Sequence, residues 1–159
     1  MEVGRLRRVP EPASDGFTLV ELVLAVAVLV ILATIANAAY SGVIERARVT
    51  HAMSDIAEFQ MRIERYRSAN GDYPDELDAV NRDGRVDPWG NPYYYTLLEG
   101  VKGHGTARKD HKLNPLNSDY DLFSAGRDGV FKTQITQKDS LDDVIRARTG
   151  SYIGLAEDY

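Results

Sequence analysis

The sequence predicts an α+β fold, in which one long N-terminal helix carries a small, mostly antiparallel sheet on its second half. Two observations lead to this fold class. An apolar run at residues 17–39 continues, without Pro, into a helical apolar stripe that reaches about residue 69. Beyond the stripe, short aromatic and β-branched segments alternate with turns rich in Gly, Pro and Asp, a pattern typical of short strands.

The apolar run, residues 17–39, predicts a membrane-spanning first half of the helix. At about 1.5 Å per residue these positions reach about 34 Å, enough for the ~30 Å hydrocarbon core of a bilayer. Glu21 is the one charged residue in the run. A carboxylate at that depth needs a partner. A cut after Gly16 would supply one, because Phe17 would then carry a new α-amine, and a neighbouring copy could supply the same amine.

Residues 1–16 are predicted to be a leader peptide. Three arginines within it, at positions 5, 7 and 8, favour a cytoplasmic N-terminus. An ordinary secretory signal is the first alternative, but the apolar run is too long and more helix-forming sequence follows its small residues. A plain signal anchor is the second, and it leaves Glu21 unexplained.

Residues 16–22, GFTLVEL, resemble the processing site of type IV pilins and type II secretion pseudopilins. The resemblance implies that a membrane peptidase cuts after Gly16 and methylates the new N-terminus at Phe17. It also implies an assembly role for Glu21, with Thr18 beside it. In that family the glutamate registers each incoming subunit against the N-terminus of its neighbour.

Composition limits what residues 40–159 can be. They suffice for one small domain, with too little chain for two. The net charge of −5, from 19 basic and 24 acidic residues, disfavours general binding of nucleic acid. The chain has no cysteine, so an exported domain of this size must be stabilised in another way, by a metal or by assembly.

The second half of the predicted helix has two distinct faces. Apolar residues recur every three or four positions and predict the seat of the domain; they are Val49, Ala52, Ile56, Phe59, Ile63 and Tyr66. The opposite face is charged and is interpreted as solvated; it carries Glu45, Arg46, Arg48, Asp55, Glu58, Arg62, Glu64, Arg65 and Arg67. Asn70 and Gly71 are expected to end the helix.

Residues 87–95, DPWGNPYYY, predict a tight turn followed by a strand at 93–97. Trp89 and the tyrosines are expected to pack between this strand and the long helix. A sugar or nucleic-acid platform is the alternative for such an aromatic cluster. The segment resembles one found in the major pseudopilin of type II secretion, which ordinary pilins generally do not carry.

A second strand is expected at residues 120–124, followed by a sharp turn at 124–129. Together with a later Asp before an aliphatic residue, this segment resembles the calcium loop of the major pseudopilins. The resemblance implies Ca²⁺ as cofactor, a hard ion suited to oxygen ligands. The implied ligands are the side chains of Asp128 and Asp143, the adjacent Asp142, and backbone carbonyls near Ala125 and Val130.

Two features depart from that family pattern. The family usually has a glycine-rich stretch after Asp-Gly, whereas residues 130–140 contain no glycine. The family also has a Trp soon after the second Asp, where this chain continues with residues 145–148, IRAR.

An Asp-Gly pair could also simply close a hairpin. Residues 152–155 are apolar enough to dock as a last turn or strand.

The resemblance therefore implies a structural role, with no enzymatic activity, as the major pseudopilin of a type II secretion system. The subunit would sit in the bacterial inner membrane with its domain in the periplasm, and would polymerise with itself to drive export of folded proteins. Its implied partners are prepilin peptidase, minor pseudopilins, and an inner-membrane assembly platform with a cytoplasmic ATPase. The alternatives are a type IV pilin or minor pilin for adhesion, motility or DNA uptake, and a tethered enzyme or binding module.

Overall fold

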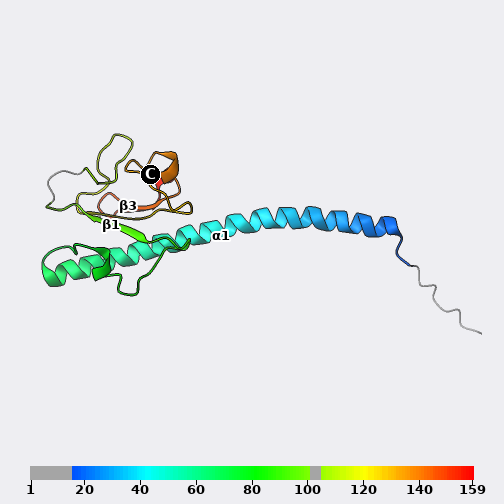
Figure 1. Cartoon of the computed structure of the whole chain (residues 1–159), viewed down its shortest axis with the longest axis horizontal. Helices are drawn as coiled ribbons and strands as arrows, with labels where there is room; N and C mark the ends of the chain where they lie inside the picture. Colours follow the sequence, from blue (N-terminus) through cyan, green and yellow to red (C-terminus); the bar gives the residue numbers. More distant parts are fainter. Residues whose placement is uncertain (1–15, 101–104) are drawn as a thin grey trace, which may run out of the picture. The chain divides into compact units, whose positions relative to one another are not determined.

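The computed structural model describes residues 16–100 and 105–159, so the predicted leader at 1–15 lies outside the described residues. The chain divides into two compact units, Met1–Ser41 and Gly42–Tyr159. Figure 1 follows the elements in chain order, and they confirm the expected α+β class. They are α1 (Leu19–Asn70), η1 (Leu77–Ala79), β1 (Tyr93–Leu97), β2 (Tyr120–Ser124), η2 (Lys138–Ser140), β3 (Val144–Ala147), β4 (Tyr152–Leu155) and η3 (Ala156–Asp158).

Residues 19–41 of α1 lie in the first unit, and residues 19–37 present apolar side chains to the outside. Leu24, Leu29 and Ile35 are each 63–64% exposed. An 18-residue window of α1 has a mean hydropathy of 2.9, and none of it is buried. By length and composition, α1 is therefore able to cross a membrane.

Residues 42–70 of α1 belong to the second unit and build its core. The predicted apolar stripe is confirmed, because its four central residues are fully buried and its two outer ones pack against them. The helix ends at Asn70, as expected. Gly71 follows with a φ of 93°, and its N–H donates to the Arg67 carbonyl at 2.8 Å. That left-handed conformation favours glycine at the end of a helix.

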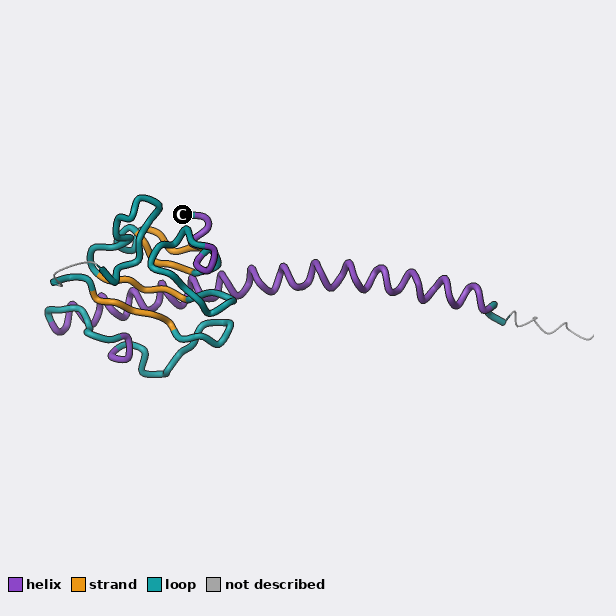
Figure 2. Tube along the Cα trace, turned by 45° about the horizontal axis from the view of Figure 1, so that its top comes forward, coloured by secondary structure: helices purple, strands orange, loops and turns teal. Residues whose placement is uncertain are grey.

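The sheet is antiparallel, with the strand order β1-β2-β3-β4. Figure 2 shows its strands in orange, beside the part of α1 that belongs to the same unit. The predicted strands at 93–97 and 120–124 are confirmed as β1 and β2. β3 was not predicted, and it pairs with β2 through Phe123↔Ile145 and Ser124↔Val144. β4 confirms that residues 152–155 dock on the domain as a strand.

Alternate residues of the strands face two different cores. The helix-side core joins α1 to the sheet and contains Ala52, Ile56, Phe59, Ile63, Tyr73, Leu77, Val80, Tyr93, Tyr120, Leu122 and Val144. The outer core covers the opposite face and contains Leu116, Phe123, Ile135, Ile145, Ala147 and Ala156. Trp89 and Tyr95 pack on the helix-side core as expected, whereas Tyr94 packs on the outer core.

Candidate functional site

The first candidate site is the start of α1, where Thr18 and Glu21 form a reciprocal capping contact. Glu21 Oε2 accepts hydrogen bonds from the Thr18 backbone N–H at 2.9 Å and from the Thr18 hydroxyl at 2.7 Å. In return, the Glu21 N–H donates to Thr18 Oγ1 at 3.2 Å. A Thr at the N-cap with a Glu three residues later satisfies two backbone donors that the helix itself cannot satisfy.

This capping contact places the predicted assembly residue directly beside the predicted cleavage point. Phe17 is 86% exposed, and no heavy atom lies within 4 Å of the position that a Cβ on Gly16 would take. Among the described residues, Glu21 Oε1 accepts no hydrogen bond. The carboxylate is therefore held at the end of the helix with one oxygen free for a cation. Cleavage after Gly16 and methylation of Phe17 stay predictions.

A second feature is the joining of the two turns whose sequences resemble pseudopilin motifs. Asp87 is 3% exposed, and its Oδ1 accepts from the N–H groups of Trp89 at 3.1 Å and Asn91 at 2.8 Å. Its Oδ2 accepts from the Ser124 hydroxyl at 2.5 Å. Asn91 Nδ2 donates to the Gly126 carbonyl at 2.9 Å. The turn before β1 is thus hydrogen-bonded to the turn after β2.

Gly126 is expected to be intolerant of a side chain. Its φ of 64° favours glycine, and a Cβ there would collide with the backbone of Asp142. We expect Gly126→Ala to lower the free energy of unfolding by about 3 kcal/mol or more, as measured by urea denaturation. Gly84→Ala is the matched control, because Gly84 has a similar φ of 61° but open space around its Cβ position.

The control variant should lose only about 1 kcal/mol, the cost of a left-handed backbone. Equal losses of unfolding free energy in the two variants would show that the backbone of Asp142 moves at little cost to make room for the added methyl group. In that case the packing of the 124–129 turn against Asp142 would contribute little to stability.

The three predicted carboxylate ligands of calcium, Asp128, Asp142 and Asp143, each have other partners in the domain. Among the described residues, no group of three or more His, Cys, Asp or Glu side chains is placed to hold a metal ion. Asp142 Oδ2 accepts from the N–H groups of Arg127 at 2.9 Å and Asp128 at 3.2 Å. Asp128 Oδ1 accepts from the N–H of Val130 at 2.8 Å. These two carboxylates therefore cap the turn that follows Ala125, and calcium binding stays a prediction.

Asp143, the third predicted carboxylate ligand, is fully buried and faces Arg108. Arg108 Nη2 donates to Asp143 Oδ2 at 2.5 Å, and Asp143 Oδ1 is buried with no hydrogen-bond partner among the described residues. Burial raises the pKa of Asp143 to about 7, while Arg108 acts to lower it. The ionised form of Asp143 therefore depends on the neighbouring guanidinium.

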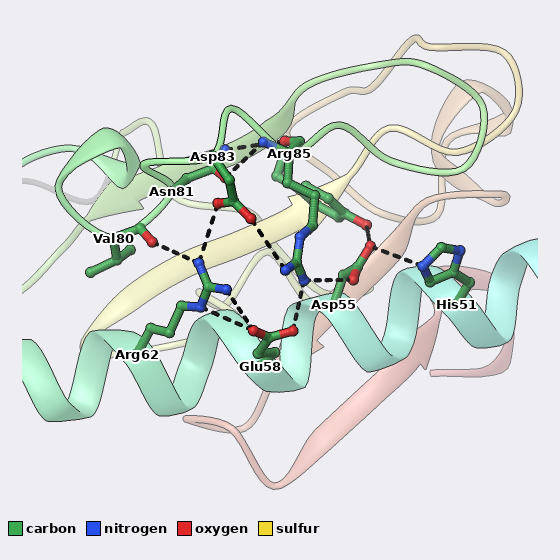
Figure 3. Close-up of polar contacts among 9 residues, drawn as sticks. His51, Asp55, Glu58, Arg62, Val80, Asn81, Asp83 and Arg85 are labelled. Atoms are coloured by element: carbon green, nitrogen blue, oxygen red, sulfur yellow. Dashed lines mark hydrogen bonds and ion pairs between the residues drawn. The ribbon is translucent and has the colours of Figure 1, made fainter.

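A network of charges on α1 corrects part of the interpretation of the charged helix face as solvated: Asp55 is buried, whereas Arg46, Arg48, Glu64 and Arg65 are exposed as expected. Asp55 is 5% exposed, and its carboxylate accepts from Arg85 Nη1 at 2.9 Å and from the Tyr93 hydroxyl at 2.7 Å. The same Arg85 nitrogen donates to Glu58 at 2.7 Å, and Glu58 also accepts from Arg62 at 2.6 Å (Figure 3). Residues 81–85 are thereby tied to α1.

This network also perturbs the groups at its centre. Burial raises the pKa of Tyr93 well above its usual value, and the hydrogen bond to Asp55 acts in the same direction. The hydrogen bonds from Arg85 and Arg62 lower the pKa of Glu58. The network therefore fixes charges in place on one face of α1, next to the turn that carries Trp89.

Arg146 is a second residue whose importance the sequence did not reveal. Its guanidinium makes a two-pronged ion pair with Asp119, at 2.9 and 2.6 Å, and its Nε donates to Gln60 on α1 at 3.0 Å. It also lies over the ring of Tyr120, with Cζ 3.9 Å from the ring centre. The sequence shows Arg146 only as part of residues 145–148, and no local pattern distinguishes it from a solvated arginine.

The apolar helix and its capped start coincide with a sequence motif that defines a class of proteins. Residues 13–37 match the family model described as the prokaryotic N-terminal methylation motif. That range contains Gly16, Phe17 and Glu21, so the chain carries the motif at the predicted place.

Comparison over most of the chain gives the particular family. The chain is 33% identical over 136 residues to the type II secretion system core protein G of Pseudomonas aeruginosa, covering 72% of this chain and 84% of that protein. The protein of the same name from Aeromonas hydrophila is 35% identical over 136 residues, with the same coverage. The Escherichia coli protein is 27% identical over 140 residues, covering 75% and 86%. No solved structure matches the chain significantly.

The chain belongs to the type II secretion system core protein G family, the major pseudopilins. The predicted resemblance is therefore confirmed, and it favours a secretion subunit over a type IV pilin. The family is one of structural subunits.

Proposed function

We propose that this protein is made as a single-pass protein of the bacterial inner membrane, with residues 42–159 in the periplasm. Prepilin peptidase cuts it after Gly16 and methylates Phe17. The processed subunits then polymerise into a periplasmic pseudopilus that drives export of folded proteins across the outer membrane. In this role the chain is a structural subunit without catalytic activity of its own.

The observation that carries the proposal is the uncovered apolar surface of α1 between Leu19 and Ile35. In water such a surface would be costly, so it needs lipid before assembly and other protein in the fibre. When neighbouring copies pack their helices together, contacts with lipid are replaced by contacts with protein. The transfer from bilayer to fibre then changes solvation little, because packing of side chains replaces lipid tails of similar polarity.

Glu21 sets the axial position that each subunit takes in the fibre. The capping contact with Thr18 keeps the carboxylate at the start of the helix, where the Phe17 amine of a neighbouring copy would arrive. An ion pair is much stronger in a medium of low dielectric than in water. The pairing therefore favours one axial position of each new subunit over all others.

The work of assembly is assigned to partners. The proposed partners are an inner-membrane platform with a cytoplasmic ATPase, which adds subunits, and minor pseudopilins that join the same fibre. The periplasmic unit contributes the fixed surface of each subunit, held by the joined turns at 87–92 and 124–129.

A deletion strain tests this function. We expect specific proteins to accumulate in the periplasm and to disappear from the culture supernatant, while surface pili and surface motility persist. The measurement is a comparison of periplasmic and supernatant proteins by mass spectrometry, with a plasmid copy of the gene as the control. Intact secretion together with loss of pili or motility would contradict the proposal and identify a type IV pilin instead.

A further inference from the structure

The segment after the Asp128-Gly129 turn is held to the domain by packing. Residues 130–140 contain no glycine. Instead, Ile135 is fully buried in the outer core. Phe131 packs its ring against Tyr94 and Phe123, with ring centres 4.6 and 4.8 Å apart. This departure from a glycine-rich loop thus supplies apolar side chains that cover the outer face of the sheet.

Backbone hydrogen bonds join the same segment to Lys109. The Lys109 N–H donates to the Thr133 carbonyl at 2.8 Å, and the Ile135 N–H donates to the Lys109 carbonyl at 3.0 Å. The neighbouring Arg108 N–H donates to Asp121 Oδ2 on β2 at 2.6 Å. Arg108 is therefore fixed at its backbone on both sides, between the covering segment and the sheet.

The guanidinium of Arg108 lies inside this layer, with the residue only 3% exposed. Its Cζ is 4.2 Å from the ring centre of Phe123 and 5.6 Å from that of Phe131, distances typical of cation–π contacts. Its Nη2 holds Asp143, the residue before β3. The buried guanidinium of Arg108 thus joins one end of the 125–143 loop to the aromatic rings on the outer face of the sheet.

The geometry points to a role for this charge: we propose that Arg108 is the built-in cation of the 125–143 loop and takes the place of a metal ion. Asp143 already shares one oxygen with the guanidinium, and a Ca²⁺ at its other oxygen would lie close to a fixed positive charge in a medium of low dielectric. One oxygen of Asp128 and one of Asp142 already accept hydrogen bonds from backbone N–H groups of the turn. This inference stands apart from the proposed function and opposes the calcium prediction.

The test compares thermal unfolding of the purified full chain in detergent micelles, followed through the single tryptophan, Trp89. For the wild type we expect the same melting temperature in EDTA and in millimolar Ca²⁺. For Arg108→Met in EDTA we expect a melting temperature lower by about 10 °C or more, because Asp143 is left buried without a counter-charge. Millimolar Ca²⁺ should recover part of that loss, since both Asp143 oxygens are then available.

Two further variants separate this role from a general loss of packing. Arg146→Met also removes a buried guanidinium, and its melting temperature should not respond to Ca²⁺. Arg108→Lys keeps a positive charge but loses the planar fork, so it should lose less stability than Arg108→Met and respond less to Ca²⁺.

Three results would overturn the proposal. They are a wild-type melting temperature that falls in EDTA and recovers with Ca²⁺, an Arg108→Met variant as stable as the wild type, and a loss in that variant that Ca²⁺ leaves unchanged. If Arg108→Met does not fold, calorimetric titration of the wild type with Ca²⁺ decides. No binding supports the built-in cation, and binding that raises the melting temperature refutes it.

Discussion

Replacing Glu21 with Leu should leave the protein in the membrane but abolish fibre assembly. The apolar run becomes more apolar, so insertion is retained. The carboxylate that would meet the amine of a neighbouring copy is lost, and with it the preferred axial position of each new subunit. We expect the variant in the membrane fraction at wild-type amount, with chemically cross-linked oligomers and secreted proteins reduced to the level of the deletion strain.

Two companion variants separate pairing from helix capping and from polarity. Glu21→Gln retains an oxygen that accepts from Thr18 but carries no charge, so it should fail as Glu21→Leu does. Thr34→Val is the matched control within the apolar run, because among the described residues the Thr34 hydroxyl donates only to the carbonyl of Ile31, at 2.7 Å. It should assemble normally. Normal assembly of Glu21→Gln would instead assign the role of Glu21 to capping.

Arg146→Met should be among the most destabilising single changes in the second unit. It leaves Asp119 buried without its counter-charge, and breaking a buried ion pair in this way typically costs about 3–5 kcal/mol. We expect a loss of that size in the free energy of unfolding, measured by urea denaturation of the full chain in micelles. Natural domains have about 5–15 kcal/mol in total, so much of the stability should be lost.

The matched control for this variant is Arg48→Met. Arg48 pairs with Glu45 at 3.7 Å on the surface, with side chains 44% and 33% exposed. Surface pairs contribute about 1 kcal/mol or less, so the control should behave almost as the wild type. Similar losses of unfolding free energy in Arg146→Met and Arg48→Met would contradict the prediction, because the buried pair would then stabilise the domain no more than the surface pair.

The same pair should leave a signature in the dependence of stability on pH. Burial raises the pKa of Asp119, but the hydrogen bonds from Arg146 and from the Tyr120 N–H outweigh it, and the folded-state pKa is lowered. A carboxyl group whose pKa is lowered by folding stabilises the folded state at pH values above its unfolded pKa of about 3.9. This stabilisation is lost as the pH falls through the pKa of the folded state. The difference in melting temperature between the wild type and Asp119→Asn should therefore narrow below about pH 4.

The sequence predicted those parts of the fold that depend on local pattern. The long helix, its apolar stripe and its end at Asn70 follow from composition and spacing along one element. Strands β1 and β2 follow from short aromatic and aliphatic runs next to turns. β3 was missed because only Val144 and Ile145 look like strand residues, and the charged residues on either side resemble a loop.

Buried charges were the main part that the sequence could not predict. Asp55 lies among exposed charges on α1, and its burial depends on Arg85, 30 residues away. Arg108 and Asp143 are separated by 35 residues, and Asp119 and Arg146 by 27. Nothing near any of these residues marks it as internal, because the partner that makes burial possible is brought in by the fold. The resemblance to a calcium loop identified Asp143 but gave no sign of Arg108.

The two buried arginines also bear on how the middle strands find their alignment. β2 and β3 are joined by only two residue pairs, a ladder that backbone hydrogen bonds alone define weakly. A slip of one residue would exchange the faces of β3. It would turn Arg146 away from Asp119 and move Asp143 away from Arg108, leaving unpaired charges on both faces at once. Buried unpaired charges thus raise the free energy of mispaired and aggregation-prone arrangements of these strands.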